Sequence, residues 1–158
     1  MPKIDIDTIE VTTGSSYPKQ VEGHTTLRSQ LSLGDAGGLT QFGVNLVTLV
    51  PGALSSLRHW HVQQDEFLMV TTGRCTLIDD HGETILNPGD CAAFPANDGN
   101  GHHLVNNGDV DAQFVVVGTR TATETAHYSD IDMMVTDVNN GPGIYTRKDG
   151  TPYEGEDT

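Results

Sequence analysis

The sequence contains few cysteines, few basic residues and no long apolar run. Its 158 residues include only Cys75 and Cys91. Two thiols can form one bridge, but they are too few for the disulfide framework of a small secreted scaffold. No stretch reaches the roughly 20 apolar residues of a membrane-spanning helix, and the polar start lacks the apolar run of a signal peptide. We therefore expect a cytoplasmic protein that does not enter a membrane.

Basic side chains are outnumbered by acidic ones. Eight Lys and Arg residues face 22 Asp and Glu residues, which gives a formal net charge of −14 at pH 7. Such a charge repels the phosphate backbone of nucleic acids and the headgroups of anionic lipids. The composition therefore argues against nucleic acid as a partner.

Glycine and proline are frequent, with 18 and seven copies, which favours short strands joined by turns over long helices. Residues 42–50 carry apolar side chains at most even positions, the period-two pattern of a half-buried strand. Residues 66–71 and 74–78, separated by Thr72 and Gly73, predict a hairpin. Further short strands are expected at residues 27–33, 84–86, 91–94, 102–105 and 113–118. We therefore predict an all-β protein with a closed or two-sheet architecture.

The length fits one hydrophobic core, and the pattern divides the chain into three parts. Residues 1–25 are polar and are expected to form an N-terminal arm. Residues 26–120 hold the regular strands and are expected to form a β-barrel. Residues 121–158 are mostly polar and are expected to pack as an appendage and tail.

Three polar residues in the middle of the chain predict a metal site. His59 and His61 are two residues apart, so an extended strand places both rings on one face. Glu66 opens the next strand and shares its face with apolar residues, so its carboxylate should point inward. A buried carboxylate without a counter-charge is costly and commonly binds a cation. A divalent metal between these three side chains satisfies that requirement.

A third imidazole is expected from residues 102–106. Period two places His102 and Asn106 on one face and His103 on the other. We predict His102 as the ligand, and His103 is the alternative if the preceding loop at 97–101 shifts the register. Asn106 is expected to bond to backbone at the end of the strand. No role is expected for the remaining histidines, which are His24, His81 and His127.

This pattern resembles the cupin superfamily. The first cupin motif consists of a glycine, His-x-His, four intervening residues, Glu, six intervening residues and a further glycine. It matches, with one extra residue before the first histidine, at Gly52, His59, His61, Glu66 and Gly73. The second motif runs from a glycine through Pro-Gly-Asp and a proline to His and Asn. It matches at Gly82, Pro88, Gly89, Asp90, Pro95, His102 and Asn106. The resemblance spans about residues 42–118.

The resemblance implies a double-stranded β-helix, or jelly-roll barrel, that holds a metal through three histidines and one glutamate. Such donors suit iron, manganese, nickel or zinc, and the ligand types do not choose among these metals. Octahedral coordination would leave two positions open for water, oxygen or a chelating substrate.

Two functions fit this arrangement. One is a metal-dependent enzyme of the oxygenase, isomerase or lyase type acting on a small polar organic molecule. The other is a non-catalytic module that binds or senses a small ligand. The sequence identifies no catalytic residue beyond the metal ligands and no organic cofactor.

Two further expectations concern partners. Arg28, Arg58 and Arg120 are candidates for pairing with a substrate anion, although a surface salt bridge is the commoner fate of such arginines. A jelly roll of this size keeps exposed sheet edges, and pairing between two copies is one way to cover them. We therefore expect a homodimer.

Overall fold

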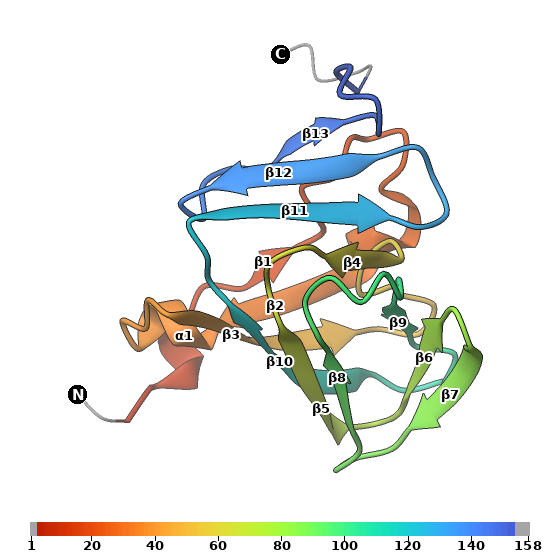
Figure 1. The fold of residues 1–158 in the computed structure, drawn as a ribbon. Helices are drawn as coiled ribbons and strands as arrows, with labels where there is room; N and C mark the ends of the chain where they lie inside the picture. Colours follow the sequence, from red (N-terminus) through yellow and green to blue (C-terminus); the bar gives the residue numbers. More distant parts are fainter. Residues whose placement is uncertain (1–2, 154–158) are drawn as a thin grey trace.

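The protein, described by a computed structural model over residues 3–153, consists of antiparallel strands with little helix. Residues 1–2 of the expected arm and 154–158 of the expected tail lie outside this range. The strands form three sheets (Figure 1). The main core cluster lies between the first and third sheets, and a second cluster packs on the strands of the other sheet. This arrangement confirms the predicted all-β jelly-roll fold.

Each sheet combines strands that are distant in the sequence. The largest has the order β1 (Thr12–Thr13), β2 (Arg28–Ser32), β3 (Phe42–Leu49), β10 (Ala112–Thr119), β5 (Glu66–Thr72) and β8 (Cys91–Phe94). The second has the order β13 (Ile144–Thr146), β12 (Met134–Val138), β11 (Thr123–Tyr128) and β4 (His59–His61). The third has the order β7 (Gly82–Leu86), β6 (Cys75–Asp79) and β9 (His103–Val105). The short helices are η1 (Ile6–Thr8), η2 (Gly23–Leu27) and α1 (Leu33–Ala36).

Strand β3 exists as predicted, but the opposite face is buried. Val47 and Leu49 lie in the core, whereas Phe42 and Val50 are exposed. The inward face also carries Asn45, which lines a cavity. The sequence pattern therefore predicted the wrong face of β3 as buried. The inner face carries a polar residue because it lines a cavity, and such positions depart from the rule that apolar residues face inward.

The predicted hairpin between residues 66–71 and 74–78 is wrong. Strand β5 pairs with β8 and β10, whereas β6 pairs with β7 and β9, so the chain passes from one sheet to another at Gly73. Gly73 has φ +67°, and a Cβ there would lie 2.5 Å from the carbonyl oxygen of Asp111. Glycine is required at this crossing because no side chain fits against the neighbouring backbone.

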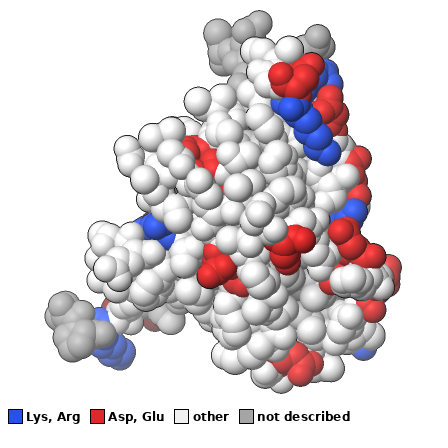
Figure 2. Space-filling model, viewed as in Figure 1, with Lys and Arg blue, Asp and Glu red and all other residues white. Residues whose placement is uncertain are grey.

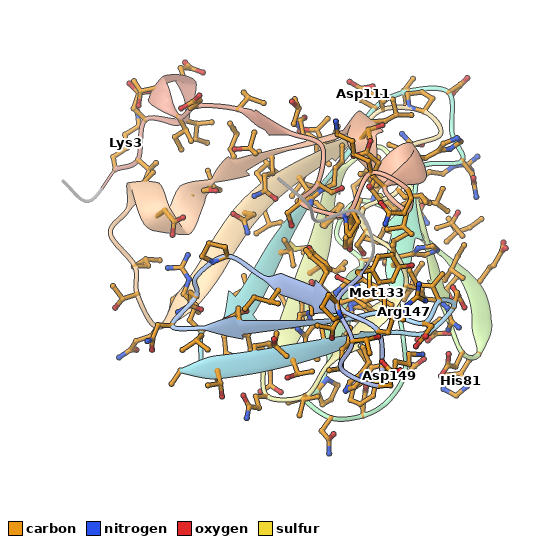
Figure 3. All side chains as sticks on the ribbon, turned by 90° about the horizontal axis from the view of Figure 1, so that it is seen from above. Lys3, His81, Asp111, Met133, Arg147 and Asp149 are labelled. Atoms are coloured by element: carbon orange, nitrogen blue, oxygen red, sulfur yellow. The ribbon has the colours of Figure 1, made fainter. Side chains whose placement is uncertain are left out.

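The segment after residue 120 contributes to the same body as the central strands. Strand β11 pairs with β4, with His61 opposite Ala126 and His59 opposite Tyr128. Met133 is fully buried in a second core cluster, and it lies within the molecule near these strands (Figure 3). The division of the chain at residues 25 and 120 stays a prediction, but this pairing places the later strands beside the predicted metal ligands.

The surface and the cysteines follow from the alternation of the strands. Cys75 is buried and Cys91 is exposed, and both are free thiols. Cys91 lies opposite the exposed Met69 on the outer face of its sheet. Figure 2 shows dispersed acidic side chains and few basic ones on the visible face. Within residues 3–153 no helix has the length and apolar character needed to cross a membrane.

Candidate metal centre

Backbone pairing brings the predicted ligands together from three segments. His59 and His102 form an antiparallel bridge, in which the backbone N–H of each donates to the carbonyl of the other, at 3.2 and 2.9 Å. Residues paired in this way project to the same side of the sheet. Their imidazole centroids lie 5.1 Å apart, and those of His59 and His61 lie 4.9 Å apart. The alternation of β4 therefore sets the spacing of His59 and His61, and strand pairing brings His102 beside them.

Glu66 is the carboxylate to which these rings converge. Its Oε2 lies 3.1 Å from Nε2 of His102 and 3.5 Å from Nε2 of His61. The ligand atoms of His59, His61 and Glu66 all lie within 4.8 Å of one another. His102 is not part of this closest group of three, but it contacts the same carboxylate oxygen. The four side chains thus offer nitrogen and oxygen donors to one small volume.

His59 is oriented by its own backbone neighbourhood. Its Nδ1 lies 2.8 Å from the carbonyl oxygen of Leu57 and donates to it, which leaves Nε2 with a free lone pair. Burial, together with the neighbouring His61, lowers the pKa of His59 to about 3. The ring is therefore neutral at pH 7, which is the form that binds a metal.

The charges of Glu66 and His61 are coupled. Burial alone would raise the pKa of Glu66, but hydrogen bonds from His102 and His61 outweigh it and lower this pKa well below its usual range. Burial would likewise lower the pKa of His61, but the hydrogen bond to Glu66 and the charges of Glu66 and Glu124 outweigh it and raise this pKa. An ionised carboxylate held among imidazoles is a site prepared for a cation.

His102 and His103 have different environments, as the alternation of the strand requires. The side chain of His102 is only 4% exposed, and its ring stacks on Phe94 at a centroid distance of 3.5 Å. Phe94 is itself the cross-strand partner of Glu66. His103 instead directs Nδ1 to the carbonyl oxygen of Ser56, at 3.0 Å. The contact with Glu66 therefore belongs to His102.

Glu124 is a residue that the sequence reasoning missed. Its side chain is 4% exposed, and its Oε1 lies 3.9 Å from Nδ1 of His61. Its carboxylate also accepts hydrogen bonds from the backbone N–H groups of Val62, Gln63 and Thr125. It thereby fixes the bend that joins His61 to Glu66. The available signal was a single acidic residue in an alternating strand after residue 120, a segment expected to lie outside the barrel.

A cavity of about 400 Å³ opens beside the cluster. It is lined by the four proposed ligands and by polar side chains that include Arg28, Gln30, Asn45 and Gln64. Of the three arginines considered above, Arg58 pairs with Asp80 and Asp130, and Arg120 pairs with Asp35. Arg28 is the remaining candidate. A polar cavity of this size accommodates a small organic molecule.

The other histidines and Asn106 lie outside the cluster. Asn106 is fully buried and bonds to the backbone of Leu49, Val110 and Gly108. His81 is an exposed turn residue at the periphery of the molecule (Figure 3). His127 stacks on Trp60 at a centroid distance of 4.7 Å. His24 directs Nδ1 to a backbone carbonyl, at 3.2 Å.

Comparisons with known proteins place this geometry in a family. Residues 45–118 match the family model of the cupin domain. The chain is 60% identical to the sugar phosphate isomerase of the cupin superfamily from Silicibacter pomeroyi. That match covers 96% of each chain, with a TM-score of 0.93. A comparison with functionally curated proteins found no match.

Two further solved structures are similar at lower identity. A proposed sugar phosphate isomerase from Acidithiobacillus ferrooxidans is 27% identical over 80% of each chain, with a TM-score of 0.72. The polyketide cyclase RemF from Streptomyces resistomycificus is 17% identical over 75% of this chain and 79% of its own, with a TM-score of 0.58. The second likeness shows the shared fold alone.

Proposed function

Because this chain belongs to the cupin superfamily, we propose that it is a metal-dependent isomerase acting on a sugar phosphate. The observation that carries this proposal is the convergence of His59 and His61 on the half-buried Glu66 beside a cavity of about 400 Å³. His102, which contacts the same carboxylate, is the fourth proposed ligand.

The donor set fits a divalent transition metal. His59 is neutral with Nε2 free, and Glu66 is ionised, so neither group has to change protonation before it binds a cation. His61 and His102 direct Nε2 to the same carboxylate oxygen. Three imidazoles and one carboxylate suit iron, manganese, nickel or zinc. When bound, such a metal supplies Lewis-acid polarisation of a substrate carbonyl or hydroxyl.

The choice of isomerisation rests on two similar proteins. The Silicibacter pomeroyi protein is a sugar phosphate isomerase with 60% identity over nearly the whole chain. The Acidithiobacillus ferrooxidans protein, at 27% identity, is a proposed sugar phosphate isomerase. The polar lining of the cavity is consistent with a polyhydroxylated substrate, whose hydroxyl groups need hydrogen-bond partners in a buried site.

The proposal is tested by metal analysis combined with a substrate screen. Purified wild-type protein, His59→Ala and Glu66→Ala are analysed for metal content, and then each is incubated with a panel of aldose and ketose phosphates. We expect about one metal per wild-type chain, turnover of at least one sugar phosphate, and loss of both in the variants. Glu83→Gln, which changes an exposed residue of β7, serves as the control. Metal binding without turnover of any member would favour the ligand-binding module instead.

We also propose that the protein is a homodimer. Phe67 and Met69, on the outer face of β5, are 43% and 38% exposed, and exposed apolar side chains on a sheet face favour association between copies. Light scattering should give a mass near twice 17.0 kDa. A monodisperse species at the mass of one chain would rule out this assembly.

A further inference from the structure

Arg28 is a cavity-lining cation without a carboxylate partner. It lies on β2 opposite Leu49, and Gln30 lies opposite Val47. Both partners are core residues, so this face of β2 is directed inward. The arginine Nη2 donates to Oε1 of Gln30 at 2.5 Å, while its buried Nε has no hydrogen-bond partner. A guanidinium carries five N–H donors, so most of its binding capacity remains available to a ligand.

No ion pair neutralises this charge, although the negative charge of Glu66 acts on Arg28 across the cavity. Among the ion pairs formed by residues 3–153, arginines pair with aspartates at Arg58, Arg120 and Arg147, but none includes Arg28. Tyr17 is close, but burial raises its pKa to about 12, so it is neutral at pH 7. Burial is also the main cause that lowers the pKa of Arg28. Arg28 is half-buried, and a cation that lines a cavity without an ion pair is costly to the fold and is expected where a ligand supplies the missing anion.

The charges around the cavity indicate the kind of anion. The acidic and basic residues that line it are Arg28, Arg120, Asp65 and Glu66. Arg120 is already paired with Asp35, so Arg28 is the remaining cation, beside the carboxylates of Asp65 and Glu66. A divalent cation at the proposed metal site would offset these two carboxylates and leave one positive charge, which attracts an anion. The oxygens of a phosphate monoester, which carries about −1.5 to −2 at pH 7, offer more acceptors to the guanidinium donors than a single carboxylate does.

We propose that Arg28, positioned by Gln30, binds the phosphate group of the substrate. This inference rests on the proposed function and adds to it the residue that selects phosphorylated over unphosphorylated sugars. Bidentate contact between a guanidinium and phosphate oxygens is a common mode of phosphate recognition. The proposed metal site and Arg28 would then bind the two ends of one small molecule within a single cavity.

The test uses inorganic phosphate as the probe, so that binding is measured separately from turnover. Isothermal titration of the metal-loaded protein should show phosphate binding, and acetate is titrated as the carboxylate comparison. Arg28→Gln should weaken phosphate binding at least about tenfold, which corresponds to loss of a charge-assisted contact. Arg74→Gln removes the same charge from an exposed residue outside this cavity and should leave the affinity unchanged.

A second variant guards against a folding defect of Arg28→Gln. Gln30→Glu keeps the size of the side chain and gives Arg28 an internal carboxylate partner. We expect this variant to bind phosphate at least about tenfold more weakly and to unfold at a higher temperature than wild type. If Arg28 and Gln30 only stabilised the fold, Gln30→Glu would not weaken phosphate binding while it raised the unfolding temperature.

The outcomes separate this inference from the proposed function. Absence of phosphate binding in wild type, equal phosphate affinity in wild type and Arg28→Gln, or tighter binding of acetate than of phosphate would each overturn the role of Arg28. Phosphate binding that depends on Arg28 without isomerisation of any sugar phosphate would support the anion site and refute the isomerase. Isomerisation with a KM that is unchanged in Arg28→Gln would support the isomerase and refute the anion site.

Discussion

Replacement of Glu124 by glutamine tests whether this carboxylate positions the metal ligands. The substitution keeps the volume of the buried side chain and one acceptor oxygen, so it creates no cavity. It removes the negative charge whose Oε1 lies 3.9 Å from Nδ1 of His61. It also places an NH₂ group where one carboxylate oxygen accepts from the backbone N–H of Gln63, at 3.2 Å. Two donors then face each other in the bend between β4 and β5.

The expected effect on metal binding follows from these two losses. Some side chains orient a metal-binding histidine through the ring nitrogen that does not bind the metal. Mutation of such a side chain typically changes the affinity for the metal by 10- to 100-fold. We therefore expect the dissociation constant for the metal to rise by about that factor, or about 1.4 to 2.7 kcal/mol. The lost hydrogen bond to a charged acceptor should also lower the free energy of unfolding by about 1.5 to 3 kcal/mol.

Competition with a chromophoric chelator measures the first quantity, and urea denaturation of the metal-free protein measures the second. Glu83→Gln makes the same chemical change at an exposed position and should move neither value. A metal affinity of Glu124→Gln within threefold of wild type would refute the argument that Glu124 orients His61. Equal loss of affinity in the Glu83 control would assign the effect to net charge instead.

The remaining predictions concern stability. Asn106→Ala leaves the buried carbonyl of Leu49, the carbonyl of Val110 and the N–H of Gly108 without their partner, so urea denaturation should show a loss of about 2 to 4 kcal/mol, against little change for the exposed Asn107→Ala. Gly73→Ala should destabilise by more than about 2 kcal/mol because of its positive φ and a 2.5 Å approach to backbone. Gly82→Ala, at positive φ in open space, should cost less, and an equal loss would contradict the clash. In metal-free protein, the unfolded chain protonates His59 near its ordinary pKa of 6.5, whereas the native pKa is about 3. Its contribution to stability should therefore fall as the pH drops through this window, by up to about 2 kcal/mol at pH 5. Unfolding of wild type and His59→Gln at pH 7 and 5 measures this contribution, and identical pH slopes would contradict it.

The sequence by itself determined the β class, the family and the residues of the cluster. The turn residues and the period-two segments located most strands, because alternation and turn chemistry are local properties. His59, His61 and Glu66 were identifiable because an inward carboxylate near two imidazoles on one face needs a cation. The alternation at residues 102–106 favoured His102 over His103, and the contact of His102 with Glu66 came only from the structure.

Only the tertiary structure decided which strands pair and which distant groups meet. The crossing at Gly73 looked like a hairpin because strand pairing depends on contacts far along the chain. The inner face of β3 looked like a solvent face because polar residues there line a cavity. The weak local signal at Glu124 did not reveal its burial, and the sequence did not separate Arg28 from Arg58 and Arg120, since burial and ion pairing are properties of the folded surroundings. The sequence therefore predicted the metal ligands, whereas only the packing of distant segments brought Glu124 beside His61 and Arg28 into the same cavity.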